Sequence, residues 1–319
     1  MAGLSGRVAL VGAGLIGRGW ATVFARAGAE AVLWDPVEGA AEAAKCHVWQ
    51  ALDDLAEAGL LSIADANTAK PRVKVAATLA DAVAGAVWVQ ENAPEKRDAK
   101  QALFAAIDAV APPAAILASS TSTFPGSTFF GHVPGRSRCL VAHPANPPHL
   151  MPVVEIVPAA FTDPDVVMRA RGIMAAVGQV PVLVKQEIEG FVMNRLQAAV
   201  IAEAMSLVAR DVIAPDDLDA VMKHSLGLRW SFMGPFETID LNAPGGVPDY
   251  VARYGPALRG LAADLRVGDA WTEEAVARIT GDRRARVPRE RLGERSLWRE
   301  RRLMRLLREK EKSDRELGR

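Results

Sequence analysis

The sequence predicts an α/β fold, in which a Rossmann-type, doubly wound and mostly parallel sheet precedes a smaller all-α C-terminal domain. Three observations support this. A glycine-rich turn joins an apolar run to a helical pattern near the amino terminus, apolar runs and helical patterns then alternate as far as residue 188, and everything after Gly190 has a helical pattern. We therefore expect a first domain over residues 1–188, with a helical insertion at about 37–72, and a helical second domain over 189–319.

The segment Arg7–Pro36 is the most specific stretch of the chain. The β-type run VALV leads into Gly12-x-Gly14-x-x-Gly17, and an alanine-rich helical pattern follows as far as Gly28. In such a unit the first glycine permits a tight turn, the second lets the backbone approach a pyrophosphate, and the third lets the helix pack on the strand. The spacing therefore predicts a dinucleotide-binding turn.

The helix after this turn supplies a phosphate site, because its first amides, from Leu15 and Ile16 onward, lack partners within the helix and lie at the positive end of its dipole. A second β-type run, AVLW, ends at Asp35. An acid about twenty residues after the turn accepts hydrogen bonds from the adenosine ribose and repels a 2′-phosphate. We therefore predict NAD as the cofactor, in preference to NADP.

Strands and helices alternate over the rest of the first domain. β-type runs cover 86–90, 114–120, 139–143, 152–157 and 178–185, and helical patterns cover 95–110 and 164–177. This alternation predicts a parallel sheet whose ligands bind at the carboxyl ends of its strands, where Ser120, Ser122 and His143 stand. The two serines also suit the simpler role of capping the next helix.

The stretch HPANPPHLMPVVEIV, from His143 to Val157, places one histidine and one glutamate around a proline-rich turn. Glu155 lies within a run typical of a buried strand, where an unpaired carboxylate is costly. One interpretation is an edge strand whose Glu155 faces water. The other is that Glu155 pairs with His143 and orients the imidazole, which suits a base near neutral pH.

The second half begins with residues 189–212, which predict a helix too apolar on every face to lie at the surface. Asn194 falls in its first turns. Because a buried asparagine must satisfy up to four hydrogen bonds, it is either a polar link between helices or a group that faces a ligand. Further helical patterns follow at 214–227 and 233–242.

The charge of the whole chain is balanced, with 38 basic and 38 acidic side chains, so the overall field gives no reason to expect nucleic acid. From Asp282 onward, fifteen Lys and Arg residues against eight Asp and Glu residues give the tail a net charge of +7. The tail is either an anion-binding or partner-binding arm, or an amphipathic helix that docks its leucines on this subunit or a second one: Leu297, Leu303, Leu306 and Leu307.

Cysteine use and hydropathy favour a cytoplasmic protein. Cys46 and Cys139 are far apart and have neither metal-like nor redox-like spacing, so we expect no metal site and a reducing compartment. We expect no secretory leader before the first strand. No apolar run approaches the length of a membrane span, so we expect no membrane partner.

Several motifs in one order resemble the 3-hydroxyacyl-CoA dehydrogenase family over nearly the whole chain, and within it the branch that contains the lambda-crystallins. They are GAGLIGRGWA, ENAPEKRDAK, ASSTS, AHPANPP, VEIVP, GFVMNRLQ, GLRWSFMGPFET and LWRERRLMRLL. The resemblance implies an enzyme that oxidises a secondary alcohol with NAD. It also implies catalytic roles: the family's histidine falls on His143, its partner carboxylate on Glu155, its active-site serine on Ser122 and its asparagine on Asn194.

The resemblance implies a second set of residues on the cofactor side. Asp35 matches the ribose-binding acid, and Glu95 and Lys100 match groups that line the nicotinamide half. Asn146 matches a further polar residue of the site. The family usually has an asparagine where this chain has Ser120, so we expect the hydrogen bonding there to differ.

The substrate is either a CoA thioester or a free acid. Family members that act on acyl-CoA present lysines from the helical insertion, whereas residues 37–62 here carry five acidic side chains against Lys45, which disfavours a pyrophosphate. The alternative is that Lys70, Arg72 and Lys74 serve instead. Arg229, which the acyl-CoA members generally lack, suits a free carboxylate, or it is a surface arginine at a helix end.

We therefore expect an NAD-dependent dehydrogenase of a small free 3-hydroxy acid: L-gulonate, 3-hydroxybutyrate or a carnitine-like compound. A 3-hydroxyacyl-CoA dehydrogenase and a non-catalytic NAD-binding structural protein, as lens crystallins are, remain as alternatives. The habit of the family and the apolar helices after Gly190 favour a homodimer formed through the second domain.

Overall fold

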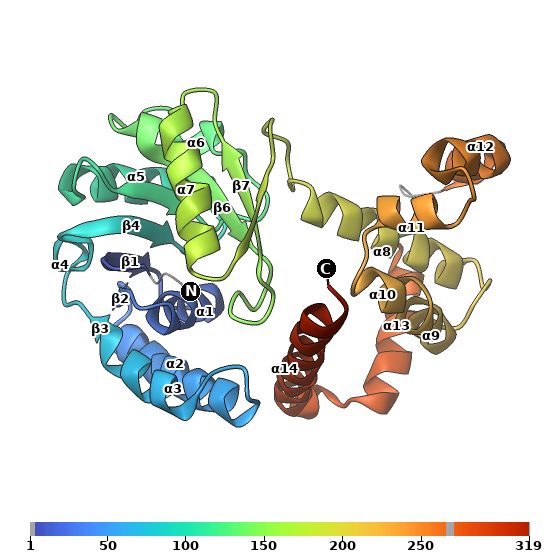
Figure 1. Ribbon diagram of the computed structural model, residues 1–319, viewed down its shortest axis with the longest axis horizontal. Helices are drawn as coiled ribbons and strands as arrows, with labels where there is room; N and C mark the ends of the chain where they lie inside the picture. The colour runs from blue at the N-terminus through green and yellow to red at the C-terminus, as the bar shows by residue number, and fades with distance from the viewer. Residues whose placement is uncertain (1–3, 266–270, 319) are drawn as a thin grey trace. The chain divides into compact units, whose positions relative to one another are not determined.

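The first part of the molecule is built on a single twisted sheet (Figure 1). The computed structural model describes residues 4–265 and 271–318, and within them eight strands form this sheet in the order β3-β2-β1-β4-β5-β6-β7-β8. The strands are β1 (Arg7–Val11), β2 (Glu30–Trp34), β3 (Val73–Val75), β4 (Ala86–Glu91), β5 (Ile116–Ser119), β6 (Cys139–Pro144), β7 (Val153–Pro158) and β8 (Val180–Leu183). Every neighbouring pair is parallel except β6 and β7, so the predicted mostly parallel sheet is confirmed.

Helices cover both faces of the sheet, as the predicted doubly wound fold requires. One face carries α1 (Leu15–Arg26), α2 (Ala40–Glu57) and α7 (Pro164–Ala176), and the other carries α5 (Arg97–Val110) and α6 (Ser127–Phe130). Successive strand residues alternate between the two layers, as Leu117 and Ala118 of β5 do. Trp20 of α1 and Phe104 of α5 are completely buried. The strand ends therefore project from a closely packed base.

The antiparallel pairing of β6 and β7 was not predicted, and it decides the position of two key residues. The ladder sets His143 directly opposite Glu155. Because β8 lies outside β7, β7 is an interior strand and Glu155 is only 2% exposed. The interpretation of an edge strand whose Glu155 faces water is therefore wrong.

The predicted insertion consists of α2, α3 (Ile63–Ala69) and a 3-10 turn (Lys70–Arg72), and it leads into β3. The sequence did not predict β3, because three residues are too few to show an alternating pattern. After it, α4 (Leu79–Val83) returns the chain to β4.

The basic tail forms α14 (Leu292–Leu317). Its Met304, flanked by Leu303 and Leu307, packs against Leu55 of α2 and against Leu150. Two of the four predicted leucines therefore dock on this subunit, whereas the other two, Leu297 and Leu306, stay more than half exposed.

Contacts divide the chain into two compact units. One contains the residues up to Asn194 together with those from Glu300 onward, and the other is Arg195–Arg299, whereas the predicted division lies at residue 188. Outside residues 266–270, the second unit has only helical elements, namely most of α8 (Met193–Ala209), α9 (Pro215–His224), α10 (Leu226–Trp230), α11 (Pro235–Leu241), α12 (Gly246–Asp264), α13 (Glu273–Arg286), a 3-10 turn (Arg289–Arg291) and the start of α14. The smaller all-α part is confirmed.

The helix α8 begins later than predicted and is less buried. Gly190 and Phe191 have φ angles of 72° and 51°, in the left-handed region that a right-handed helix cannot include. Along α8, Leu196, Val200 and Ile201 are 64%, 39% and 37% exposed. The expectation that this helix is buried on every face within the chain is therefore wrong.

None of the helices in the described part of the chain combines the length and apolarity that crossing a lipid bilayer requires.

Candidate active site

His143 and Glu155 form a buried pair at the carboxyl end of β6. The His143 Nδ1 atom lies 2.8 Å from Glu155 Oε2, and the two side chains are 5% and 2% exposed. The other carboxylate oxygen, Oε1, accepts hydrogen bonds from the amides of Val192 and Met193 at 2.9 and 3.0 Å. With an ionised Glu155, Nδ1 carries the proton and Nε2 is left to accept one.

The environment of Glu155 keeps it ionised. Burial by itself raises the pKa of Glu155, but hydrogen bonds from His143 and from the amides of Met193 and Val192 together lower it below its ordinary value. The strand therefore holds a charged carboxylate because three donors face it.

The segment from Gly190 to Asn194 connects this pair to the loop that carries Ser122. The Phe191 ring packs against the His143 ring, with 5.4 Å between their centroids. The Asn194 side-chain amide donates to the carbonyl of Ser122 at 2.8 Å, and the Gly190 amide donates to the Thr123 carbonyl at 3.0 Å. The structure thus brings together the neighbourhoods of all four predicted catalytic residues, two of them in direct side-chain contact.

The glycine-rich turn fits a dinucleotide. Gly12 has a φ of 97°, and a Cβ atom on Gly17 would lie 1.9 Å from the Gly12 carbonyl oxygen, so neither position tolerates a side chain. A Cβ on Gly14 would meet no atom within 4 Å, which leaves open space at the start of α1. Leu15 and Ile16 follow there, in the first turn of this helix, where the amides lack helical partners. The turn therefore offers room and donors for a pyrophosphate.

Asp35 lies at the end of β2 and is tied to this turn. Its Oδ2 atom accepts a hydrogen bond from the amide of Ala13 at 2.8 Å, and its Oδ1 atom accepts from the amide of Val37 at 2.9 Å. Carboxylate oxygens have about two acceptor positions each, so Asp35 retains capacity for ribose hydroxyls.

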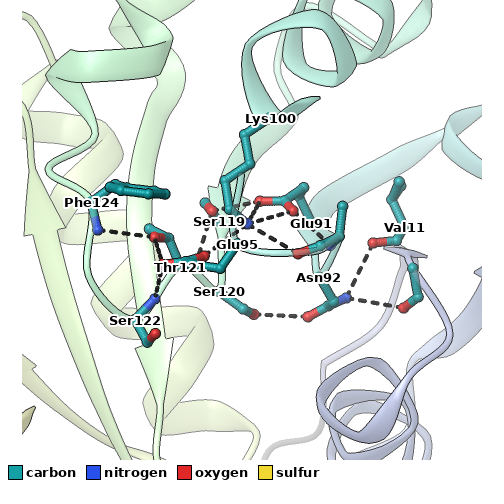
Figure 2. A network of polar contacts seen from close by, with 12 residues as sticks. Val11, Glu91, Asn92, Glu95, Lys100, Ser119, Ser120, Thr121, Ser122 and Phe124 are labelled. Carbon is teal, nitrogen blue, oxygen red and sulfur yellow. Dashed lines mark hydrogen bonds and ion pairs between the residues drawn. The ribbon is translucent and has the colours of Figure 1, made fainter. Parts of the chain in front are cut away.

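Glu95 and Lys100 belong to a buried polar network at the ends of β4 and β5 (Figure 2). Lys100 is 1% exposed, and its Nζ atom lies 2.9 Å from Glu91 Oε1 and 3.4 Å from Glu95 Oε2. Glu95 Oε1 accepts hydrogen bonds from the Thr121 hydroxyl and from the amides of Ser122 and Thr123 at 2.6, 3.0 and 3.0 Å.

The two carboxyls of this network have opposite pKa shifts. Burial raises the pKa of Glu91, although Lys100 and Ser119 lower it in part. Burial also acts on Glu95, but there the Thr121 hydroxyl, the charge of Lys100 and the amides of Ser122 and Thr123 together outweigh it and lower the pKa. Glu95 is therefore the more readily ionised carboxyl of the two.

Ser120 is the centre of a second network, on the opposite face of the sheet. Its hydroxyl accepts from Trp20 Nε1 at 3.1 Å and from Gln90 Nε2 at 2.7 Å, and it donates to Asn92 Oδ1 at 2.8 Å. The Asn92 amide then reaches the Val11 carbonyl, as Figure 2 shows. It also reaches the Gly12 carbonyl. The hydroxyl is thus fully used within the protein, and Ser120 does not cap a helix.

Sequence reasoning missed most members of these two networks, including Trp20, Gln90, Glu91, Asn92, Ser119 and Thr121. A signal was available, because QEN (90–92) and SSTS (119–122) are polar runs at two adjacent strand ends, and alternate residues there point to opposite faces. Of the remaining predicted residues, Asn146 lies exposed in the loop after β6, and Arg229 belongs to α10 in the second unit.

Comparisons with known proteins identify the family. The model of the NAD binding domain of 3-hydroxyacyl-CoA dehydrogenase matches residues 7–188, and the model of the C-terminal domain of 3-hydroxyacyl-CoA dehydrogenase matches residues 190–278. The chain belongs to the 3-hydroxyacyl-CoA dehydrogenase family. It is therefore an NAD-dependent oxidoreductase, and the predictions of family, enzyme class and cofactor are confirmed.

Individual relatives cover most of the chain. The lambda-crystallin homolog of Mus musculus is 38% identical over 305 residues, which are 95% of each chain. L-carnitine dehydrogenase of Pseudomonas putida is 38% identical over 252 residues, 79% of this chain and 77% of that one. A solved structure of an NAD+-dependent dismutase, 5-formyl-3-hydroxy-2-methylpyridine 4-carboxylic acid 5-dehydrogenase, matches with a TM-score of 0.76 at 30% identity, covering 88% of this chain and 87% of that one.

Proposed function

We propose that this dehydrogenase oxidises the 3-hydroxyl group of a small free 3-hydroxy acid, such as carnitine, L-gulonate or 3-hydroxybutyrate, with His143 as the base. The observation that carries the proposal is the buried contact of 2.8 Å between His143 and Glu155 at the end of β6. A histidine held in this way has one ring nitrogen assigned to its partner and the other available for a proton.

The residues of the site divide the chemistry among them. NAD, when bound, supplies the nicotinamide that accepts a hydride from the alcohol carbon. His143 takes the hydroxyl proton on Nε2, and Glu155 orients the ring and stabilises the imidazolium that forms. Ser122 and the second N–H of the Asn194 amide donate hydrogen bonds to the oxygen as its carbonyl develops. Asp35 recognises the ribose of the cofactor, and Asn146 completes the polar side of the site.

The charge of the helical insertion supports a free acid over a CoA thioester. Lys45 is its only basic residue other than histidine between 37 and 62, and it lies 3.9 Å from Glu42. Lys70, an alternative cation for CoA, pairs with Asp53 at 2.6 Å, and the Arg72 guanidinium donates to the Ala25 carbonyl. These cations are engaged by the protein, and the acids around them disfavour a pyrophosphate.

Arg229 is our proposed anchor for the substrate carboxylate. Its Nε atom is buried and has no acceptor within hydrogen-bonding distance among the residues that the structure describes. An unpaired buried guanidinium donor favours a carboxylate ligand, which the planar group can bind through two hydrogen bonds. Two of the relatives support this choice, because L-carnitine and the pyridine carboxylic acid in their names both carry a free carboxylate.

The discriminating experiment is NADH production across a panel of free 3-hydroxy acids and one 3-hydroxyacyl-CoA. We expect at least one free acid to be oxidised with a higher kcat/KM than the thioester. A higher value for the thioester would favour the CoA alternative, which the family name supports. NAD binding without turnover of any substrate would instead indicate a non-catalytic NAD-binding protein.

We also propose a homodimer that is formed through the second unit and works in the cytoplasm. The exposed residues Leu196, Val200 and Ile201 form an apolar surface on α8 that a second copy of the chain would cover. Leu196→Glu should convert the dimer to a monomer in light scattering, whereas the same change at exposed Leu15 should not. A reducing compartment agrees with Cys46 and Cys139, both free thiols.

A further inference from the structure

Glu91 is a fully buried carboxylate for which the proposed reaction has no direct use. It is 0% exposed and accepts hydrogen bonds from Lys100, from the Ser119 hydroxyl at 2.5 Å and from the amide of Ala93 at 2.6 Å. A buried charge of this kind persists only when its surroundings compensate for the lost hydration. Any role of Glu91 in the reaction therefore acts through these hydrogen-bonding partners.

Lys100 has no N–H group left for a ligand. Its ammonium donates to the Glu91 carboxylate at 2.9 and 3.2 Å and to the Ala93 carbonyl at 3.2 Å, and its third partner is Glu95 Oε2 at 3.4 Å. An ammonium has three donors, and all three are engaged in a group that is 1% exposed. Lys100 thus acts on other side chains of the protein, through the charge that it shares between Glu91 and Glu95.

Glu95 links Lys100 to the loop that carries Ser122. One oxygen faces Lys100, and the other receives the Thr121 hydroxyl and the amides of Ser122 and Thr123. A second connection runs in parallel, because the Ser119 hydroxyl that donates to Glu91 also accepts from the Thr121 amide at 3.1 Å. Figure 2 shows both connections converging on this loop.

We propose that Glu91 is a positioning residue: by dividing the charge of Lys100, it keeps Glu95 on the backbone amides of Ser122 and Thr123 and so fixes the Ser122 loop for the reaction. With Glu91 neutral, Lys100 has one anionic partner left and draws Glu95 away from those amides. The inference deepens the proposed function and rests on it for the effect on turnover, but the effect on the loop is independent of any substrate.

The test compares Glu91→Gln with Asp108→Asn in the full-length enzyme. Asp108 is a matched control, because it forms a buried ion pair with Arg138 at 2.6 Å and accepts an amide hydrogen bond from Gly135, at the start of β6 rather than its end. Ser119→Ala is a milder variant that keeps both charges and removes one connection. Amide hydrogen exchange at Ser122 and Thr123, kcat and the KM for NAD are measured for each.

We expect exchange at Ser122 and Thr123 to be about tenfold faster in E91Q, with a smaller acceleration in S119A and none in D108N. With the best substrate of the panel, kcat should fall about tenfold in E91Q while the KM for NAD stays within about twofold. Adding Lys100→Met to E91Q should restore part of the lost protection at these amides, because the charge that draws Glu95 away from them is then gone. Unchanged exchange in E91Q, or equal effects in E91Q and D108N, would overturn the proposal.

These outcomes separate the inference from the proposed function. If no substrate is turned over but exchange accelerates in E91Q and S119A alone, the positioning of the loop stands and the proposed reaction fails. If E91Q does not fold, amide exchange at Ser122 and Thr123 in S119A tests the proposal instead. Exchange in S119A equal to that of the wild type would then overturn the role of Glu91.

Discussion

The two units of this dehydrogenase use their side chains in opposite ways. In the first, the ionisable side chains of His143, Glu155, Glu91 and Lys100 are at most 5% exposed, and each has a partner at short distance. In the second, ion pairs such as that of Arg278 with Asp211 lie at the surface, and apolar residues are exposed. Buried pairs are screened much less by salt and fix geometry, whereas surface pairs contribute little to stability.

The difference indicates a division of labour. The first unit builds its polar site from its own strands, so its chemistry is set when that unit folds. The second unit presents the buried Arg229 Nε atom, which has no acceptor among the described residues, and exposed apolar side chains; we propose that these bind a substrate carboxylate and a second copy of the chain. Variants of the first unit should therefore change the chemical step and cofactor choice, and variants of the second should change substrate recognition and association.

The largest expected effect comes from His143, the proposed base. His143→Asn should lower kcat by about a thousandfold, since general-base catalysis contributes about 10² to 10⁴. The KM for NAD should hardly change, and steady-state NADH production measures both. Glu187→Gln is the control, because that carboxylate also accepts a backbone amide, from Ser127, outside the site. More than a tenth of wild-type kcat in H143N would contradict the assignment of the chemistry to this pair.

The second prediction concerns the other unit. Arg229→Ala should raise the KM for the free acid by about 10- to 100-fold, as expected for the loss of hydrogen bonds to a charged group at about 1.5–3 kcal/mol. The KM for NAD should stay constant. Arg259→Ala serves as the control, an exposed arginine of the same unit. An unchanged KM for the acid would contradict the proposal that Arg229, in the second unit, binds the substrate carboxylate.

The preference for NAD over NADP should change only in variants of the first unit. Asp35→Ser should lower kcat/KM for NAD by about tenfold, because a hydrogen-bonding carboxylate is lost, and should narrow the preference over NADP, because the repulsion of a 2′-phosphate is lost. The measurement is kcat/KM with each cofactor. Glu38→Gln, a change at an exposed acid three residues along, should leave the preference intact. An unaltered preference in D35S would be evidence against this role.

The last effect should be on stability rather than on activity, as a loss of stability in acid. Burial, together with the charges of Arg26 and Arg18, lowers the pKa of His149 to about 4 from 6.5. Below pH 6.5 the unfolded chain binds a proton that the folded chain refuses until about pH 4, so stability falls as pH falls through this window. For this half-buried side chain we expect a loss of about 2 kcal/mol, less than the full shift implies.

His149→Asn should flatten this part of the curve of unfolding free energy against pH, measured by urea denaturation. Asp249→Asn in the second unit is the contrasting variant. Its carboxylate pairs with Arg253 at the surface, where salt screens the interaction. Equal flattening of the curve by both variants would contradict the expectation that a buried ionisable group affects stability more than an exposed one.

Much of the first unit could be predicted because its signals are local. The glycine spacing, the acid at Asp35 and the alternation of strands and helices each follow from neighbours in sequence. One prediction about local structure failed and one strand was missed, both for tertiary reasons. The helix after Gly190 starts late because the chain turns at Phe191 to bring amides to Glu155, and β3 forms only because β2 offers it a partner.

The sequence by itself determined the family, the cofactor and the strand ends at which polar residues gather, since backbone geometry and side-chain period act over a few residues. Only the tertiary structure decided which polar groups meet. The antiparallel register of β6 and β7 sets His143 against Glu155, and the pairing of β4 with β5 sets Glu91 beside Ser119. Such contacts join residues 12 to 28 positions apart, and their formation depends on the order and register of the strands in the assembled sheet.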